Sequence, residues 1–255
     1  MNDGRGAAFD DIYGTDPNSW AFHDTPDPLV RYLRDRRLRV ALSLLAPAIA
    51  PESPLWSALV TCGGAGGEGT WLADHGFGPV IVSDISRNAL EICRRRDSRL
   101  GVMELDAQSM GLADDAYDLV LVQDGLHHLE RPTAAFGEML RVARRAVVVI
   151  EPYRGLVGQL FGKTWETQAG VANYVFRWRG WLVRDLTRSQ LVGSSYTVRV
   201  VRLWDHNLMV ARFARLGGAG RGGLRAARVT YAALAPFSWA GNMMVAIVVK
   251  TRPGG

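Results

Sequence analysis

A glycine-rich turn is the part of the chain whose residue types point most directly to chemistry. It lies between an apolar run, Leu55–Thr61, and a helical pattern, Glu68–His75. Glycines between a strand and a helix let a ligand approach the backbone, and the amides at the start of the helix face that ligand. The turn therefore predicts a nucleotide-like ligand, with close packing as the alternative. The residues expected to contact the ligand are Cys62, Gly63, Gly64 and Gly66.

An acidic residue stands at the end of the next expected strand, Pro79–Ser83. Asp84 follows Gly66 by about eighteen residues, a spacing at which an acidic side chain accepts hydrogen bonds from ribose hydroxyls. The other interpretation is a cap for the following helix, which Ser86 provides equally well. The position relative to the glycine turn favours ribose.

Alternating strand and helix patterns surround these residues. Helices are expected at Leu29–Leu45, Glu68–His75, Arg87–Asp97 and Thr133–Arg144. Strands are expected at Leu55–Thr61, Pro79–Ser83, Val102–Leu105, Tyr117–Gln123, Ala146–Ile150, Tyr196–Leu203 and Met243–Lys250. Short apolar strands between helices indicate an α/β protein with a Rossmann-like, mostly parallel seven-stranded sheet and helices on both faces.

The chain is expected to form one domain with four parts. Residues 1–54 are an N-terminal arm and cap helix, irregular over 1–28, and residues 55–152 are the cofactor-binding core. Residues 153–194 are a lid or substrate insert, and 195–255 complete the sheet. The glycine-rich segment Gly217–Gly223 is expected to be a flexible loop, because it follows no strand. The insert contains the aromatic residues Trp165, Tyr174, Phe176, Trp178 and Trp181, which either wall an apolar acceptor pocket or form their own small core.

Six short motifs follow one another in order between residues 55 and 152. They are Cys62–Gly66, Asp84-Ile85-Ser86, Asp106-Ala107-Gln108, Asp114–Val120, Leu126-His127-His128-Leu129 and Glu151-Pro152. In this order and spacing the sequence resembles the class I S-adenosylmethionine-dependent methyltransferases, in the broad group that includes the ubiquinone and menaquinone methyltransferases. The resemblance implies S-adenosylmethionine as cofactor and S-adenosylhomocysteine as its product. It also implies ribose contacts from Asp84 and Ile85, and adenine contacts from Asp106 and Ala107.

Hydride-transferring dehydrogenases are the alternative that the glycine turn leaves open. Gly64, Gly66 and Gly69 satisfy the dehydrogenase spacing as well, so the turn alone does not discriminate. The paired histidines after the fourth strand and the Asp106-Ala107 pair favour the methyltransferase.

Two positions depart from the family pattern. Val60 stands where the family has an acidic residue, and Cys62 stands where it has a glycine. The acidic residue normally supports the loop or the amino acid part of the cofactor. Loop carbonyls or Asp124 are expected to take over that role, and Gln123 is expected in the same site.

The N-terminal arm has a weaker resemblance. Asp16-Pro17-Asn18-Ser19-Trp20, followed by an arginine-rich helix, resembles the entry of some small-molecule methyltransferases whose arm closes over the cofactor. Trp20 is therefore a candidate cofactor contact. The alternative is an arm that packs on the core through Phe9, Trp20 and Phe22.

Catalysis of methyl transfer needs a positioned nucleophile, exclusion of water and, for a hydroxyl or carbon acceptor, a base. His127 and His128 are the candidate bases because they follow a strand whose carboxyl end faces the cofactor, and Glu151 is a further candidate. The other interpretation of the histidine pair is a hydrogen-bonded turn. No metal site is expected.

Charge and cysteine content narrow the partners and the compartment. The net charge is +5 and the calculated isoelectric point is 9.5, but the arginines are scattered, which does not favour a nucleic-acid partner. Two cysteines make no disulfide framework, so a reducing cytoplasm is expected. No apolar stretch is long enough to span a membrane. A small-molecule acceptor, such as a natural product or secondary metabolite, is expected; the alternatives are an RNA or protein methyltransferase and a non-methylating cofactor binder.

Overall fold

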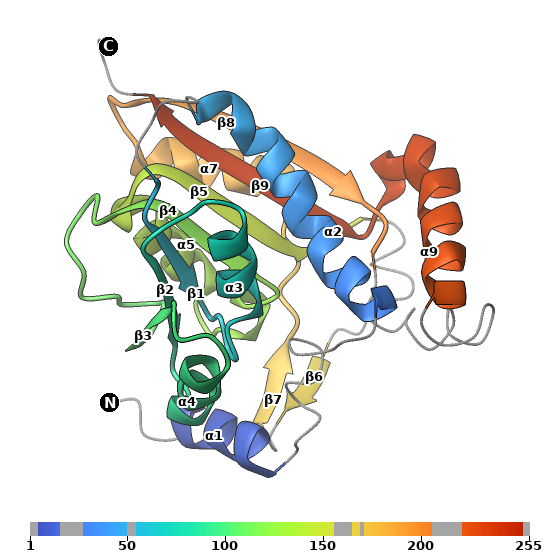
Figure 1. The fold of residues 1–255 in the computed structure, drawn as a ribbon. Helices are drawn as coiled ribbons and strands as arrows, with labels where there is room; N and C mark the ends of the chain where they lie inside the picture. The colour runs from blue at the N-terminus through green and yellow to red at the C-terminus, as the bar shows by residue number, and fades with distance from the viewer. Residues whose placement is uncertain are drawn as a thin grey trace.

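A seven-stranded sheet with the order β3-β2-β1-β4-β5-β9-β8 forms the centre of the structure (Figure 1). The computed structural model describes residues 5–15, 28–49, 55–155, 165–168, 171–205 and 221–251. The parallel strands are β1 Ala58–Thr61, β2 Val80–Asp84, β3 Gly101–Glu104, β4 Tyr117–Gln123 and β5 Ala143–Pro152. Strand β9, Met243–Thr251, runs antiparallel to β5 and to β8, Ser195–Leu203. The predicted mostly parallel, Rossmann-like sheet is confirmed, with an antiparallel strand near one edge.

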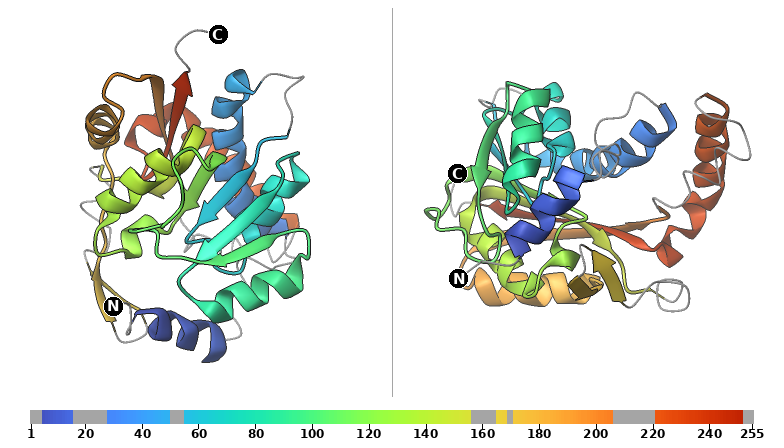
Figure 2. Two further views of the ribbon diagram at one scale, coloured as in Figure 1. Left: turned by 90° about the vertical axis from the view of Figure 1, so that its left-hand side faces the viewer. Right: turned by 90° about the horizontal axis from the view of Figure 1, so that it is seen from below.

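Alternate residues of the central strands enter two apolar layers. Val60, Leu121 and Val148 face the layer covered by α2 Pro28–Leu45, α3 Gly67–Asp74 and α4 Arg87–Arg96. Leu59, Val120 and Val147 face the layer covered by α5 Pro132–Val142 and α7 Gly180–Gln190. Figure 2 shows helices on both faces of the sheet. These strands are apolar in nearly every position because both of their faces are buried.

The strand order reverses between β1 and β4, since β2 and β3 lie on one side and β5 on the other. In open parallel sheets, ligands bind beyond the carboxyl ends of the strands at such a reversal. The fold therefore places the candidate site at the ends of β1 and β4.

Two predicted elements differ in the structure. Helix α1, Arg5–Thr15, lies within the segment expected to be irregular, and α9, Arg221–Leu234, includes the end of the expected glycine-rich loop. The rest of that loop, 217–220, lies outside the described residues. Helix α9 forms because Ala227 and Tyr231, at helical spacing, bury their side chains against Leu29 and Leu33 of α2. This contact outweighs the low helix propensity of the two glycines in the first turn of α9.

The start of β5 is a smaller difference. Residues 143 and 144, expected at the end of a helix, are already in the strand. Arg144 and Arg145 lie 3.1 and 3.0 Å from the carboxylate of Asp118 in β4. These ion pairs extend the β4–β5 pairing toward α5, so the helix ends at Val142.

The segment after β5 divides into two parts. A hairpin is formed by β6, Trp165–Gln168, and β7, Val171–Tyr174, and helix α7 follows it. Trp178 is fully buried, with ring centroids 5.5 Å from Phe136 and 5.3 Å from Phe176. Trp165 and Tyr174 form an exposed edge-to-face pair on the hairpin, 5.6 Å apart. The aromatic residues of this segment therefore do not form one pocket wall.

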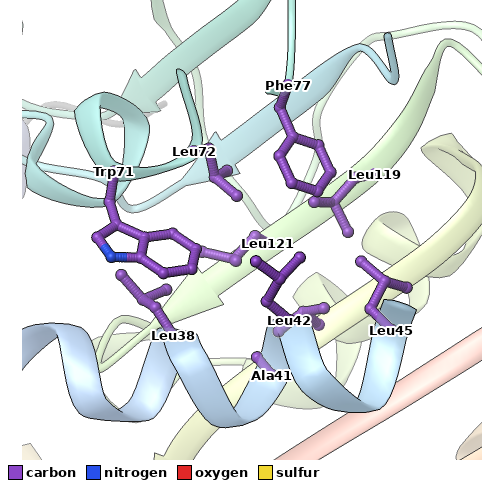
Figure 3. Close-up of a pocket in the computed structure, with 10 residues that line it drawn as sticks. Leu38, Ala41, Leu42, Leu45, Trp71, Leu72, Phe77, Leu119 and Leu121 are labelled. Carbon is purple, nitrogen blue, oxygen red and sulfur yellow. The ribbon is translucent and has the colours of Figure 1, made fainter. Parts of the chain in front are cut away.

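A small apolar cavity lies between α2, α3 and the sheet (Figure 3). Its volume is about 10 Å³, and its walls include Leu38, Leu42, Trp71, Phe77 and Leu121. A space of this size holds at most one water molecule, and the apolar walls offer a water no adequate set of partners. It is a packing defect of the core, remote from the polar residues of the candidate site.

Three short 3-10 turns complete the described elements: η1 Ala46–Ala48, η2 Leu126–His128 and η3 Ala235–Ala240. Among the described helices, none is long and apolar enough to cross a membrane. The described residues also contain no cluster of three or more His, Cys, Asp or Glu side chains suited to a metal ion.

Candidate cofactor and active site

The predicted cofactor residues gather along one edge of the sheet. Because β1, β2, β3 and β4 are parallel, the glycine loop, Asp84, Asp106 and Gln123 all follow carboxyl ends at this edge. Trp20, also predicted here, lies outside the described residues. The edge coincides with the reversal of strand order between β1 and β4.

Hydrogen bonds fix the glycine loop as a turn. The Gly63 amide donates to the carbonyl of Ser83 at 2.9 Å, and the Gly64 amide donates to Asp84 Oδ2 at 2.9 Å. Asp84 Oδ1 accepts from the Ser86 amide at 3.0 Å, and the Ser86 hydroxyl caps α4 by accepting from the Ala89 amide at 3.1 Å. Asp84 is therefore not needed as the helix cap. Its carboxylate links the glycine loop to the end of β2.

The glycines of the loop serve different purposes. Gly64 and Gly66 have φ angles of +50° and +84°, which favour glycine. A Cβ atom on Gly66 would overlap the sulfur of Cys93, and one on Gly63 would lie 2.7 Å from Val82 Cγ1. Gly66 is therefore required by packing against α4. Its contact with a ligand stays a prediction.

Cys62 and Ile85 border the loop. Cys62 has a φ of +53°, and burial raises the pKa of its thiol above the ordinary value, so the thiol stays protonated. Gly125, after β4, packs directly against the Cys62 side chain, where a Cβ atom would lie 2.5 Å from the cysteine Cβ. The carbonyl of Ile85 lies against Gly6 of α1. Cys62 thus joins the ends of β1 and β4.

Helix α1 lies beside α4 and covers this loop (Figure 1). Asp10 Oδ1 accepts hydrogen bonds from the Ser86 hydroxyl at 2.6 Å and from the Asn88 amide at 3.0 Å. The Tyr13 hydroxyl lies directly over the Cα of Gly64. Burial, followed by the charges of Asp84 and Glu68, raises the pKa of Tyr13, so its phenol is neutral and can donate a hydrogen bond.

A buried carboxylate stands at the start of α3. Glu68 is 3% exposed and accepts a hydrogen bond from Gln123 Nε2 at 3.0 Å. Gln123 Oε1 is buried and has no hydrogen-bond partner within the described part of the chain. A buried carbonyl oxygen without a donor is costly, so this pair is suited to a ligand that brings N–H groups.

The position of Glu68 discriminates between the two cofactor classes. Dinucleotides place their pyrophosphate at the N-terminus of the helix after the glycine turn. Glu68 is the second residue of that helix, and its negative charge would repel a pyrophosphate. S-adenosylmethionine carries a sulfonium and an ammonium group, which an edge with Glu68, Asp84 and Asp106 suits. The residues present therefore fit the sulfonium cofactor and oppose the dehydrogenase alternative.

Asp106 adopts the conformation of a side-chain turn. Its Oδ1 accepts from the Gln108 amide at 2.9 Å and from Gln108 Nε2 at 3.2 Å. Gln108 Oε1 accepts from the Arg131 amide at 2.9 Å. Ala107, predicted as the small partner of Asp106, is buried. These bonds fix the loop after β3 relative to the start of α5.

A buried cation lies behind the site. Arg37 of α2 is fully buried, its Nη1 donates to Asp124 Oδ2, and its Nε lies 3.7 Å from Asp205 Oδ2. Burial works against the charged forms, but Arg37 outweighs it and holds the pKa of Asp124 below its ordinary value. Burial raises the pKa of Asp205, which Arg37 and Arg36 only partly offset. Asp124 is thus engaged with Arg37, which speaks against its expected role in holding the methionine amino group.

The paired histidines lie in the turn η2. His127 Nδ1 is 2.7 Å from Glu151 Oε2, and Glu151 Oε1 accepts from the amides of Gly125 at 2.9 Å and Leu126 at 2.7 Å. Both oxygens of Glu151 are therefore engaged, one with His127 and the other with the amides of the turn. Burial, with the proximity of His127, lowers the pKa of His128 to about 3. His128 is neutral at physiological pH, and its ring meets that of Phe9 edge-on at 6.5 Å.

Sequence reasoning did not single out Tyr13, Arg37 or Glu68. Arg37 follows Leu33 by one helical turn, which places it on the apolar face of the helix. This position in the sequence indicates a buried cation. Glu68 stood within the glycine-turn segment without an assigned role. Tyr13 had no sequence signal, since α1 itself was not predicted.

Comparison with known proteins agrees with this geometry. Residues 60–150 match a family model described as a methyltransferase domain. Over these 91 of the 255 residues the chain is similar to methyltransferase domains. Over 72 residues the chain is 33% identical to the demethylmenaquinone methyltransferase of Renibacterium salmoninarum, a match that covers 28% of this chain and 30% of that relative's length. This match agrees with the class of protein that the sequence resemblance implied.

Solved structures share the fold of this chain. An S-adenosylmethionine-dependent methyltransferase from Thermotoga maritima superposes with a TM-score of 0.59 at 16% identity, covering 96% of this chain and 99% of its own. Magnesium protoporphyrin IX methyltransferase from Synechocystis PCC 6803, with bound S-adenosylhomocysteine, superposes with a TM-score of 0.55 at 15% identity, covering 98% and 96%. At these identities the likeness extends to the fold alone.

Proposed function

We propose that this protein transfers the methyl group of S-adenosylmethionine to a small, largely apolar acceptor. The observation that carries the proposal is the set of carboxylates at the carboxyl edge of the sheet, above all the buried Glu68 beside the orphaned oxygen of Gln123. The cofactor supplies an activated methyl group on a sulfonium. The protein's task is then to hold the cofactor, position the acceptor and exclude water.

The cofactor contacts follow from the order of the strands. Asp84 and Ile85 are proposed for the ribose, as the family resemblance implies. Asp106 and Ala107 are proposed for the adenine, and Gly63 and Gly64 for the backbone contacts beside the methionine part.

Glu68 and Gln123 are proposed to hold the methionine ammonium group. Val60 lacks the carboxylate that the family has at that position, and Asp124 is engaged with Arg37. Glu68 supplies a negative charge, and Gln123 Oε1 supplies a buried acceptor without a donor. The Tyr13 hydroxyl, over Gly64, is proposed as a donor to the methionine carboxylate.

His127 is proposed as the base for an acceptor that must lose a proton. With the proton of His127 on Nδ1, donated to Glu151 Oε2, Nε2 is left as the basic nitrogen. His128 is proposed to line the site with Phe9 of α1 rather than to carry a proton. The hairpin of β6 and β7 lies against η2 and places the exposed pair Trp165 and Tyr174 on the neighbouring element. These rings are proposed to contact the acceptor.

Calorimetry with S-adenosylhomocysteine and with NAD tests the cofactor site. We expect micromolar-range binding of the former and none of the latter. Asp84→Ala should weaken binding by about 10- to 150-fold, the effect of losing a charge-assisted hydrogen bond worth ~1.5–3 kcal/mol.

Release of S-adenosylhomocysteine, measured with a panel of phenols, quinols and amines, tests the transfer itself. NAD binding with no response to S-adenosylhomocysteine would overturn the cofactor assignment. Cofactor binding with turnover only on RNA or protein would overturn the acceptor class, and binding without any turnover would favour a non-methylating role.

A further inference from the structure

Helix α9 and the turn η3 form one end of the molecule, outside the methyltransferase domain (Figures 1 and 2). Helix α9 packs against α2 through Ala227 and Tyr231. Arg36 of α2 lies over the Tyr231 ring, 4.2 Å from its centroid. The inner face of α9 is therefore committed to the body of the protein, and its opposite face is exposed.

Three arginines lie along one side of α9, and the last of them, Arg228, also reaches over the Tyr32 ring of α2, 5.6 Å from its centroid. Arg221, Arg225 and Arg228 follow one another at intervals of four and three residues, which places them on the same side of the helix. All three side chains are exposed. Residues 206–240 contain five arginines and no acidic residue. Positive charge on this end is thus not balanced by carboxylates from its own segment.

Large apolar side chains are exposed on the same two elements. Val229 of α9 is 70% exposed, and Phe237 and Trp239 of η3 are 54% and 64% exposed. Exposed aromatic side chains grouped in this way mark interaction surfaces. Together with the arginines they form what we call the α9–η3 surface: Arg221, Arg225, Arg228, Val229, Phe237 and Trp239.

The turn that carries the aromatics is fastened to the sheet. Trp204 Nε1 donates to the carbonyl of Phe237 at 3.0 Å, and the Gly241 amide donates to that of Ser238 at 2.9 Å. A Cβ atom on Gly241 would lie 2.5 Å from the carbonyl oxygen of Leu203, so the chain after η3 is pressed against the end of β8. These contacts hold Phe237 and Trp239 outward.

We propose that the α9–η3 surface binds a lipid bilayer that contains anionic headgroups. Tryptophan and phenylalanine favour the boundary between headgroups and acyl chains, and arginines are attracted to anionic headgroups. The charge of the segment fits an anionic bilayer, and both features lie on adjoining elements. The attachment is peripheral, since no described helix can span a membrane.

This inference is independent of the proposed reaction, because none of its residues belongs to the cofactor site. It has a consequence for an apolar acceptor, which partitions into membranes. Attachment through the α9–η3 surface would hold the protein where such an acceptor is concentrated.

Flotation of the full chain with vesicles tests the proposal. Vesicles of phosphatidylcholine alone are compared with vesicles that contain about one third phosphatidylglycerol, the anionic component that each arginine should contact. We expect binding to the anionic vesicles, little binding to the neutral ones, and loss of binding at high salt. Arg221→Gln with Arg225→Gln should weaken binding roughly 25-fold, about fivefold for each arginine near an anionic surface.

Matched variants separate the two components of the surface. Phe237→Ser with Trp239→Ser should reduce binding at every lipid composition, because the apolar anchor is lost. Arg94→Gln with Arg95→Gln, which removes two exposed arginines from α4, should bind as the parent does. Unchanged far-ultraviolet dichroism and S-adenosylhomocysteine binding would establish that each variant is folded.

Three outcomes would overturn the proposal: no binding to anionic vesicles, an unaltered affinity in both surface variants, or an equal loss in the α4 control. Dimerisation that is abolished by the Phe237 and Trp239 changes would assign the surface to a second copy of the chain. Tighter binding to a nucleic acid than to anionic vesicles, lost in the Arg221 and Arg225 variant, would assign it to that partner.

Discussion

The cofactor edge and the α9–η3 surface carry opposite kinds of charge. Three carboxylates lie at the carboxyl end of the sheet: Glu68 at the start of α3, Asp84 at the end of β2 and Asp106 after β3. The other region displays arginines and exposed aromatics, and no acidic residue occurs after Asp205. The net charge of +5 conceals this separation. Each region suits a ligand of the opposite charge. The charge of each region is therefore more informative about its ligand than the net charge of the whole chain.

Between the two regions lies the buried pairing of Arg37 with Asp124 and Asp205. It joins α2 to the end of β4 and to the residues after β8. Its charges are compensated locally, unlike those of either outer region. The charges of the two outer regions are suited to binding a ligand, whereas the charges of the buried pairing stabilise the fold. The variants described below test this distinction.

The largest expected effect concerns His127. His127→Gln should lower kcat by roughly 10²- to 10⁴-fold, the usual contribution of a general base, while S-adenosylhomocysteine binding stays within about twofold. Glu151→Gln should lower kcat more than it raises KM, because it disturbs the orientation of the imidazole. Single-turnover rates and calorimetry measure the two quantities. Parallel losses of rate and cofactor affinity would make the histidine pair a structural turn only.

Removal of Arg37 should have the largest effect on stability. Arg37→Met removes the cation of Asp124 and leaves the buried Asp205 with Arg36 alone, and breaking a buried pairing costs about 3–5 kcal/mol of the free energy of unfolding. Urea unfolding followed by circular dichroism measures the loss. The control is Arg94→Met, an exposed ion pair on α4, which should change stability by less than about 0.5 kcal/mol. Similar effects of the two changes would contradict the distinction drawn above.

Glu68→Gln tests the charge of the cofactor edge. The variant keeps the shape of the side chain but removes its charge, so binding of S-adenosylmethionine should weaken about 10- to 150-fold, or ~1.5–3 kcal/mol. Glu91→Gln, an exposed glutamate on α4, is the matched control and should bind as the parent does. An unchanged affinity in Glu68→Gln would leave the ammonium group to other acceptors.

The smallest expected effect concerns the ion pair of Asp97 with Arg99, which belongs to neither the cofactor edge nor the α9–η3 surface. The side-chain hydrogen bond from Arg99, 2.7 Å from Asp97 Oδ2, lowers the pKa of Asp97 from 3.8 to about 2. A carboxyl with a depressed folded pKa stabilises the protein above its unfolded pKa and loses that contribution as the pH falls through the folded value. Since the Arg99 side chain is 54% exposed and solvent screens its charge, we expect less than about 1 kcal/mol. The stability difference between parent and Arg99→Gln should vanish between pH 4 and pH 2; a constant difference would exclude this ion pair as its cause.

The strands of the sheet could be predicted from the sequence, whereas parts of the candidate site could not. Strand β4 has the predicted bounds, and Ser86 caps α4 as expected, because burial on both faces and capping both leave local patterns. Helices α1 and α9 form through contacts with distant residues, such as Asp10 with Ser86, which leave only weak local patterns.

The candidate site shows the same division. The order of motifs located the loop and Asp84, since parallel strands bring their carboxyl ends together. The positions of Tyr13 and the partner of Glu68 depend on how helices pack over that edge. Glu68 and Gln123, 55 positions apart in the sequence, are brought together only by the tertiary structure.

The place of β9 in the sheet has a consequence for biosynthesis. This strand pairs with β5 on one side and β8 on the other, yet about ninety residues of sequence separate its start from the end of β5. At ~5–20 residues per second, a ribosome needs roughly 5–18 s to make that interval. During this time β5 has an unpaired apolar edge, which is a template for association with other chains. The edge of β5 is therefore open to such association until β9 has been made.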